Sequence, residues 1–297
     1  MDASETARAI DAALSIAVTL GLPADTASVL HNSNKLSLRL LPCDVFARVS
    51  SSGHEHARFE IQLAQLLAAA GGSVAELEPR VAPRGYEHDG FEVSLWRYYE
   101  PAAAMISPKA YSDALERLHS AMRTVHVVTP HFSDRVAEAE QVVRNHERSP
   151  ALDADDRDML ASTMTRLRRS LDDRAPVEQL LHGEPHPGNL LSTVGGPRFI
   201  DLETCCRGPV EFDLAHVPTA VSDRYPGVDR ALLGDCRQLV LAMVAAWRWD
   251  ADDHFPNGLW FGDELISALR SGPPWPTLDE LVGRAGPAVP QTAIRPG

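Results

Sequence analysis

The pattern of apolar and polar positions in the first hundred residues predicts two helices and several short strands. Apolar residues recur at helical spacing over residues 6–20, which end at Gly21, and over residues 56–70, which end at Gly71. Other short stretches, bounded by turn residues, have the composition and alternation typical of strands. The predicted strands are residues 28–30, 36–40, 45–49, 81–83 and 91–96, with a turn over residues 86–90.

Helical patterns dominate after residue 99. Pro101 and Pro108 bracket a segment that we interpret as a linker. We therefore expect an α+β protein with a small β-rich part, residues 1–98, and a larger, mainly helical part, residues 99–297. The main helices predicted in the second part are residues 111–125, 133–148, 155–171, 232–249 and 263–270.

Composition and charge narrow the class of protein. The net charge of -13 at pH 7 argues against a nucleic-acid-binding protein and is compatible with a cationic small-molecule substrate, although the same acidity also serves solubility. The four cysteines form no C-x-x-C motif, which indicates reduced thiols. The N-terminus does not resemble a signal peptide, and the longest apolar stretch, residues 239–247, is too short to span a bilayer. We expect a cytoplasmic protein without a membrane partner.

One stretch of the chain holds the strongest candidates for catalysis. Residues 182–189 read HGEPHPGN, in which Glu184 and Asn189 have the five-residue spacing of the base and the metal-binding amide in a kinase catalytic loop. Two short strand-like segments around a Gly-Gly turn then lead to Asp201. A hairpin brings its outer ends together, so we expect Asn189 beside Asp201. Two hard oxygen ligands favour Mg²⁺, and the pattern predicts a magnesium site.

Three motifs together resemble the aminoglycoside phosphotransferase and choline kinase superfamily. They are HGEPHPGN (182–189), IDLE (200–203) and GPVEFDL (208–214), against a family pattern of H-G-D-x-H-x-x-N, I-D-[WFL]-[ED] and G-x-x-x-x-D-L. The resemblance implies a protein-kinase-like two-lobe fold, with an antiparallel sheet and a helix in the N-lobe and a mainly helical C-lobe. It also implies an ATP-dependent kinase that phosphorylates a hydroxyl group of an aminoglycoside-like or other small polar acceptor with Mg²⁺. GTP is an alternative phosphate donor.

The resemblance also assigns roles to individual residues. Glu184 falls on the position of the catalytic base, and Asn189 and Asp201 fall on the two Mg²⁺ ligands. Arg48 takes the position of the ATP-binding lysine, and Glu60 that of the helix glutamate that pairs with this cation. The other residues assigned to the nucleotide are Ser33 and Asn34 in the covering loop and Leu95 and Tyr98 in the hinge that reads adenine.

The chain departs from the family pattern at three places. Glu184 stands where the family has aspartate, Arg48 stands where it has lysine, and the nucleotide-covering loop contains no glycine. Arginine keeps the positive charge but is bulkier than lysine, and the extra methylene of glutamate moves the carboxylate outward. The alternative to an active kinase is therefore a nucleotide-binding pseudokinase or scaffold of the same fold.

Two further residues are expected to support the catalytic loop, residues 182–189: His182 from beneath, and Asp213 through hydrogen bonds.

Overall fold

The computed structural model describes residues 1–32, 35–51 and 55–284. The chain forms two compact units. Unit 1 consists of Met1–Met105 and Ser192–Glu203, and unit 2 consists of Ile106–Leu191 and Thr204–Gly297.

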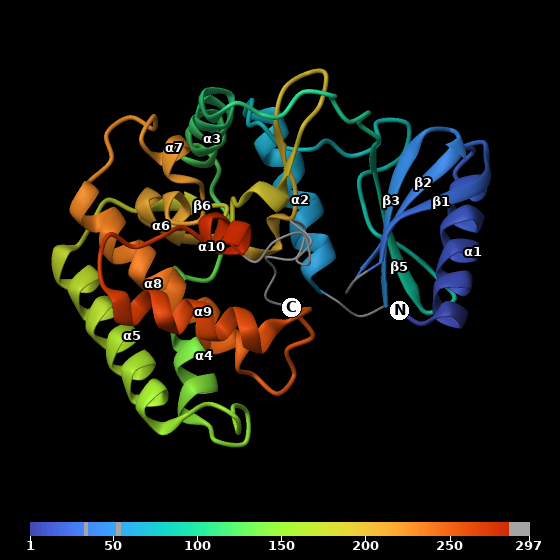
Figure 1. Ribbon diagram of the computed structural model, residues 1–297. Helices are drawn as coiled ribbons and strands as arrows, with labels where there is room; N and C mark the ends of the chain where they lie inside the picture. Colours follow the sequence, from blue (N-terminus) through green and yellow to red (C-terminus); the bar gives the residue numbers. More distant parts are fainter. Residues whose placement is uncertain (33–34, 52–54, 285–297) are drawn as a thin grey trace. The chain divides into compact units, whose positions relative to one another are not determined.

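Unit 1 is built on an antiparallel five-stranded sheet in the order β1-β2-β3-β5-β4 (Figure 1). The predicted helices and most of the predicted strands are present, with ends that differ by a few residues. The elements of unit 1 are α1 (Ala3–Thr19), β1 (Ala24–Asn32), β2 (Leu36–Pro42), β3 (Val45–Ser51), α2 (Glu55–Ala69), β4 (Tyr86–His88), β5 (Phe91–Arg97) and β8 (Arg198–Phe199).

The alternation of residues along β3 separates an apolar face of the sheet from a polar one. Val45, Ala47 and Val49 are fully buried in the same cluster as the alanines of α1, so this helix covers the apolar face (Figure 1). Arg48 lies between them in sequence and points to the opposite face, where it meets Glu60 of α2. The period-two pattern therefore directs the one charged residue of β3 toward α2.

One predicted strand of unit 1 is wrong. Residues 81–83 lie in an irregular loop, and the strand before β5 is β4, inside the stretch predicted as a turn. The true turn has only two central residues, Asp89 and Gly90, and both have positive φ (48° and 79°), as a type I′ hairpin requires. Pro83 has no N–H for a sheet hydrogen bond, which disfavours a strand at the predicted place.

The segment Ser192–Glu203 belongs to unit 1, whereas the sequence placed it in the second part of the chain. The Phe199 N–H donates to the Ser73 carbonyl at 2.7 Å, and the Ala75 N–H donates to the Phe199 carbonyl at 2.9 Å. These backbone bonds attach Asp201 to the unit that carries Arg48. Pairing between residues so far apart in the sequence leaves no local signal. The predicted boundary at residue 98 therefore did not assign Ser192–Glu203 to the first part of the chain.

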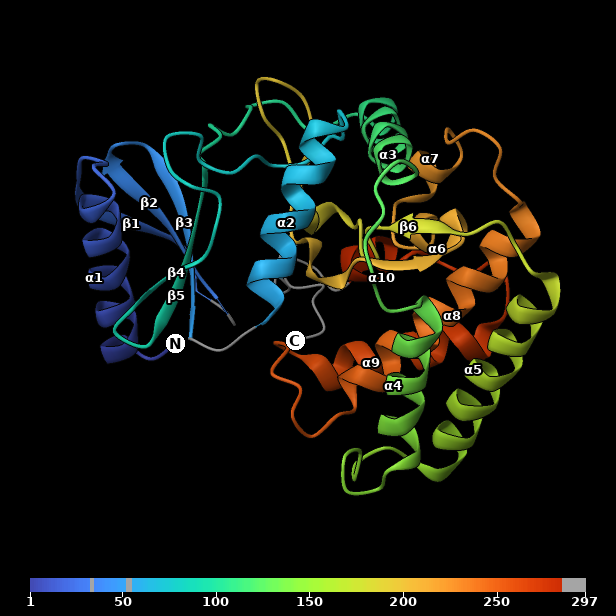
Figure 2. The ribbon, with the colours of Figure 1, turned by 180° about the vertical axis from the view of Figure 1, so that it is seen from behind.

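Unit 2 is mainly helical, with α8 at its centre. The second half of α8 is almost entirely buried, and α4, α5 and α9 pack around it (Figure 2). Each of the five helices predicted here is present with shifted ends. The elements are α3 (Pro108–Met122), α4 (Phe132–Arg144), α5 (Ala154–Arg174), β6 (Gln179–Leu181), β7 (Leu190–Leu191), β9 (Cys206–Gly208), α6 (Val210–Leu214), α7 (Thr219–Ser222), α8 (Arg230–Arg248), α9 (Gly258–Ser271) and α10 (Leu278–Arg284).

A short antiparallel pair positions the predicted catalytic loop, residues 182–189, in unit 2. Gln179 of β6 lies opposite Gly208 of β9, and Leu181 lies opposite Cys206. β6 leads directly into the catalytic loop, while β9 leads into α6, which carries Asp213. The pairing of these two strands therefore brings Asp213 next to the start of the loop.

Two properties of the described residues bear on the expected class of protein. The four cysteines are all buried, and none of them forms a disulfide in this structure. Among the helices that the structure describes, none combines the length and the apolar character needed to cross a membrane.

Candidate active site

Unit 1 brings Arg48, Glu60 and Asp201 together in a buried ionic cluster. Arg48 Nη1 donates to both carboxylate oxygens of Glu60, at 2.7 and 2.8 Å, and Arg48 Nη2 lies 3.4 Å from Asp201 Oδ1. The side chains of Glu60 and Asp201 are only 3% and 5% exposed. The predicted Arg48–Glu60 pair is present, and the predicted metal ligand Asp201 joins it.

Electrostatics keep Arg48 positively charged within this cluster. Burial disfavours its charged form, but the carboxylates of Glu60, Asp201 and Glu203 outweigh burial and raise the pKa of Arg48.

Asp201 also has a left-handed backbone with φ of 67°, a conformation uncommon outside glycine. Such a conformation persists only where the surroundings hold it, and such positions concentrate at functional sites.

Another ion pair of unit 1 was missed by the sequence prediction. Lys35 Nζ is paired with Glu203 Oε2, two residues after Asp201. The available signal was that Lys35 is one of only two lysines in the chain and directly follows the predicted nucleotide-covering loop. Ser33 and Asn34, the residues predicted within that loop, lie outside the described residues.

The two predicted hinge residues lie on β5 and directly after it. Leu95 is buried in the core of unit 1, and its carbonyl accepts a hydrogen bond from the Glu78 N–H at 3.0 Å. Tyr98 is half-buried, and the Arg39 guanidinium lies 3.9 Å from the centroid of its ring. The adenine-binding roles of Leu95 and Tyr98 stay predictions.

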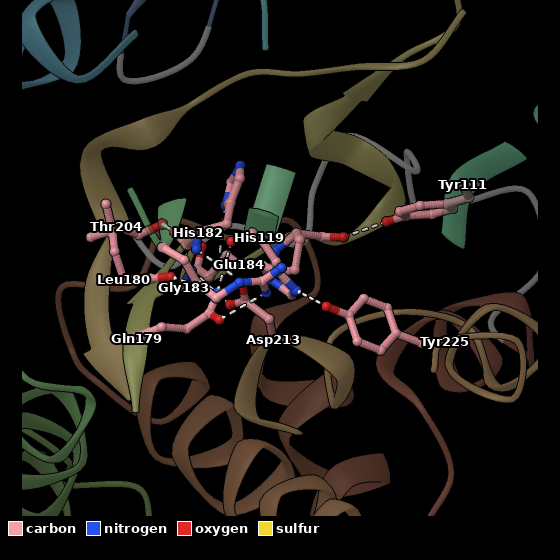
Figure 3. A network of polar contacts seen from close by, with 12 residues as sticks. Tyr111, His119, Gln179, Leu180, His182, Gly183, Glu184, Thr204, Asp213 and Tyr225 are labelled. Carbon is pink, nitrogen blue, oxygen red and sulfur yellow. Dashed lines mark hydrogen bonds and ion pairs between the residues drawn. The ribbon is translucent and has the colours of Figure 1, made fainter. Parts of the chain in front are cut away.

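In unit 2, Asp213 anchors the start of the catalytic loop through backbone amides (Figure 3). Its Oδ2 accepts the His182 N–H at 2.9 Å, and its Oδ1 accepts the Gly183 N–H at 2.8 Å. His119 lies between Asp213 and Tyr225, with Nε2 2.9 Å from Asp213 Oδ2 and Nδ1 2.8 Å from the tyrosine oxygen. Burial alone would raise the pKa of Asp213, but the hydrogen bonds and nearby histidines lower it. Asp213 is thus the anchor that the sequence predicted.

The histidines of the catalytic loop brace its backbone. His182 Nδ1 accepts the Glu184 N–H at 3.4 Å, and His186 Nδ1 accepts the N–H two residues later at 3.0 Å. From α3, the Tyr111 hydroxyl donates to the Pro185 carbonyl (Figure 3). These local bonds give the proline-rich loop a defined shape, and they agree with the bracing role predicted for His182.

Asn189 is fixed by the same loop. Its Nδ2 donates to the Glu184 carbonyl at 3.0 Å and lies 3.3 Å from His186 Nε2. These contacts orient the amide so that Oδ1 is the remaining acceptor. Oδ1 is buried and has no hydrogen-bond partner among the residues that the structure describes. Such an oxygen is costly to bury without a partner, and a cation would satisfy it.

Glu184, the predicted base, forms a buried ion pair that the sequence did not reveal. Arg135 of α4 donates to Glu184 Oε1 through Nη2, and the two side chains are 13% and 5% exposed. Burial disfavours the charge on Arg135, but the charge and hydrogen bond of Glu184, together with other nearby groups, raise the pKa of Arg135. Nothing in the local sequence marks Arg135 among the many arginines of the chain, because the contact spans about fifty residues.

The profile of the phosphotransferase enzyme family matches residues 32–247, most of the chain. The chain belongs to the phosphotransferase enzyme family. No curated protein matches the sequence. The matched region contains the Arg48–Glu60–Asp201 cluster, the catalytic loop and Arg135.

Several solved structures resemble this family member at low sequence identity. An amicoumacin kinase in complex with AMP-PNP, Ca²⁺ and Ami is 12% identical over 94% of this chain and 100% of that chain, with a TM-score of 0.66. A spectinomycin phosphotransferase in complex with ADP is 13% identical over 91% and 96%, with a TM-score of 0.58. Choline kinase LicA from Streptococcus pneumoniae is 14% identical over 87% and 98%, with a TM-score of 0.60. These likenesses confirm the predicted kinase-like fold.

The residues of this family member fit a magnesium ion by their chemistry. Asn189 offers a buried amide oxygen, and Asp201 a buried carboxylate, both hard ligands of the kind Mg²⁺ prefers. Asn189 belongs to unit 2 and Asp201 to unit 1, so their adjacency stays a prediction. Among the described residues, no group of three or more His, Cys, Asp or Glu is arranged to hold a metal ion.

Proposed function

We propose that this family member transfers the γ-phosphate of ATP to a hydroxyl group of a small polar acceptor, aminoglycoside-like or of another kind. The observation that carries this proposal is the Arg48–Glu60–Asp201 cluster of unit 1. In protein kinases, a cation paired with a helix glutamate and a metal-binding aspartate must both be in place for phosphoryl transfer. Here the three groups are buried together.

Each predicted site residue has a role in this proposal. Arg48 contacts the α- and β-phosphates, and Glu184 accepts the hydrogen of the acceptor hydroxyl and aligns it for attack. Asn189 and Asp201 hold Mg²⁺, which when bound neutralises charge on the phosphate oxygens. The residues proposed to contact the rest of the nucleotide are Ser33, Asn34, Leu95 and Tyr98.

The solved relatives support the choice of donor and acceptor. The amicoumacin kinase was solved with AMP-PNP and the spectinomycin phosphotransferase with ADP, which supports ATP. Two structures of aminoglycoside phosphotransferases contain GDP, and one of these also contains kanamycin, which supports GTP as the alternative donor. Kanamycin, spectinomycin and choline are therefore the first acceptors to test.

The test is ADP release from Mg·ATP across these acceptors, for the wild type and for Asp201→Asn. Removing one charge-stabilising group from a phosphoryl-transfer site costs about 100-fold or more in kcat, and we expect at least this loss. The matched control is Asp89→Asn. Asp89 is also an aspartate of unit 1 with positive φ and an arginine neighbour, Arg8 at 3.9 Å, but it is exposed. Activity that survives Asp201→Asn would show that the metal assignment is wrong.

The same assay, combined with a thermal-shift measurement, separates a kinase from a pseudokinase. A protein that binds Mg·ATP is stabilised by it in proportion to occupancy, whether or not it transfers phosphate. Stabilisation together with turnover of an acceptor supports the kinase. Stabilisation by Mg·ATP without ADP release for any acceptor would instead support a nucleotide-binding pseudokinase.

A further inference from the structure

The buried ion pair between Arg135 and Glu184 joins the predicted base to a helix of unit 2. Arg135 lies in the first turn of α4, and its Nη2 donates to Glu184 Oε1. The same guanidinium approaches the loop backbone, with Nη1 donating to the Gly183 carbonyl at 3.4 Å. One side chain therefore contacts both the carboxylate that would meet the acceptor and the backbone directly before it.

Arg135 is itself held in place from several sides. Its guanidinium lies 5.3 Å from the centroid of the Trp247 ring on α8. The start of α4 is closed by a capping box at His131, whose N–H donates to Asp134 at 2.8 Å. The Arg207 N–H of β9 donates to the Pro130 carbonyl at 2.8 Å, which attaches this helix start to the strand pair below the catalytic loop. Arg135 is thus a rigid support.

The backbone before Glu184 is also fixed. The Glu184 carboxylate can therefore move mainly by rotation about its own side-chain bonds. Gly183 has φ of +88°, and a Cβ at this position would lie 2.1 Å from the Thr204 carbonyl oxygen. Asp213 binds the N–H groups of His182 and Gly183. A glutamate has one more rotatable bond than an aspartate, so its carboxylate needs a restraint of its own to stay in one orientation.

We propose that Arg135 is a positioning residue for catalysis, which holds the Glu184 carboxylate in the orientation that meets the acceptor hydroxyl. This inference rests on the proposed function. Arg135 does not touch the reacting atoms; it acts through Glu184. The arrangement keeps the longer carboxylate pre-organised, and a misplacement of about 1 Å at such a group costs on the order of 100-fold in rate.

The first test compares steady-state kinetics of the wild type, Arg135→Met and Arg135→Lys with Mg·ATP and the acceptor that the panel identifies. We expect Arg135→Met to lower kcat by about 10- to 100-fold, with KM for both substrates changed less than about 3-fold. Arg135→Lys keeps the charge and should recover part of this loss. An unchanged kcat would overturn the inference, and so would a higher acceptor KM at constant kcat, because that would make Arg135 an acceptor-binding residue.

A matched control separates positioning from a general loss of stability. Arg157 of α5 is another buried arginine of unit 2, with Nη1 2.8 Å from Ser149 Oγ and Nη2 2.6 Å from the Ser149 carbonyl. We expect Arg157→Met to lower the melting temperature but to keep kcat at an assay temperature well below melting. An equal loss of kcat in Arg157→Met and Arg135→Met would overturn the positioning role.

A double-mutant cycle tests the coupling between Arg135 and Glu184 even if Arg135→Met folds poorly. The carboxylate of Glu184→Asp is one methylene shorter, and we expect it to lose the contact with Arg135. Arg135→Lys should then change kcat by less than about 2-fold in that background and by more in the wild type. Equal effects in both backgrounds would overturn the inference. A wild type that phosphorylates no acceptor would overturn the proposed function and this inference together, whereas an active wild type without coupling would overturn the inference alone.

Discussion

At the residue scale, two positions carry a longer or bulkier side chain than the family pattern leads one to expect, and each is tied to a partner of opposite charge. Arg48 is bound by Glu60 and lies beside Asp201, and Glu184 is bound by Arg135. A charge removed from water needs such a partner, because burial alone would disfavour its ionised form. The substitutions therefore belong to organised sites, which favours an active protein over a degraded one.

A residue-scale prediction concerns His216, a buried ring in edge contact with Phe212, with a centroid distance of 5.3 Å. Neither ring nitrogen has a hydrogen-bond partner among the described residues. Burial, with Arg135 nearby, lowers the pKa of His216 to about 3. The folded protein therefore keeps the ring neutral, while the unfolded chain binds a proton below its ordinary pKa of 6.5.

Because the folded pKa is lowered, the free energy of unfolding should fall as the pH drops from about 6.5 towards 3, by at most about 1.4 kcal/mol per pH unit from this residue. We expect His216→Leu to remove this part of the pH dependence. Urea unfolding at pH 7, 6, 5 and 4 measures it, with exposed His146→Leu as the control. Parallel profiles for the wild type and His216→Leu would contradict the assignment.

At the scale of elements, the β6–β9 pair and α6 determine the shape of the catalytic loop. Thr204, two residues before β9, passes so close to the loop that a side chain at position 183 has no room beside its carbonyl oxygen. α6 then presents Asp213 to two loop amides. The loop is therefore shaped by the elements on either side of it in space, and its two prolines alone would not produce that shape.

An element-scale prediction follows for Gly183→Ala. The added Cβ meets a backbone oxygen at 2.1 Å and also requires φ of +88°, so we expect a loss of stability clearly larger than the roughly 1 kcal/mol that positive φ costs by itself. Gly227→Ala is the matched control, because Gly227 has φ of +71° but no atom lies within 4 Å of the place that its Cβ would occupy. Thermal unfolding of both variants measures the difference; equal losses would mean that the loop yields to the added methyl group.

At the scale of the whole molecule, charge decides how a nucleotide can bind. The chain has a net charge of -13. In unit 1, the Arg48–Glu60–Asp201 cluster and the Lys35–Glu203 pair together contain three carboxylates and two cations. A nucleotide triphosphate is itself strongly anionic, so it meets repulsion unless a divalent cation accompanies it.

The molecular-scale prediction is that ATP stabilises the protein only with a divalent cation. Millimolar Mg·ATP should raise the melting temperature by about 3 °C or more, since a ligand at 100 times its Kd contributes about 2.7 kcal/mol. ATP with EDTA should change the melting temperature by less than about 1 °C. The control is Mg²⁺ alone. Equal shifts with and without the cation would contradict a metal-dependent nucleotide site.

The helices and most of the strands were predictable from the sequence, because periodicity and turn residues are local signals. The kinase-like fold was implied by the resemblance of three motifs to a known family. The motifs around Glu184, Asn189 and Asp201 also predicted the family, which the profile match confirms. The strand at Tyr86–His88 was missed because its type I′ turn was read as part of a longer one. The assignment of Ser192–Glu203 to unit 1 was missed because it depends on backbone pairing between distant residues.

By itself, the sequence determined which chemical groups this protein brings to its candidate site: a carboxylate, an amide and an aspartate in kinase order, and an arginine at the cation position. Only the tertiary structure showed which partners hold them in place. Arg135 pairs with Glu184, Asp213 binds the amides of the catalytic loop, and Lys35 pairs with Glu203, two residues after Asp201. The reason is physical. Spacing along the chain reports local geometry, whereas the partner of a buried charge is chosen by packing between elements far apart in the sequence.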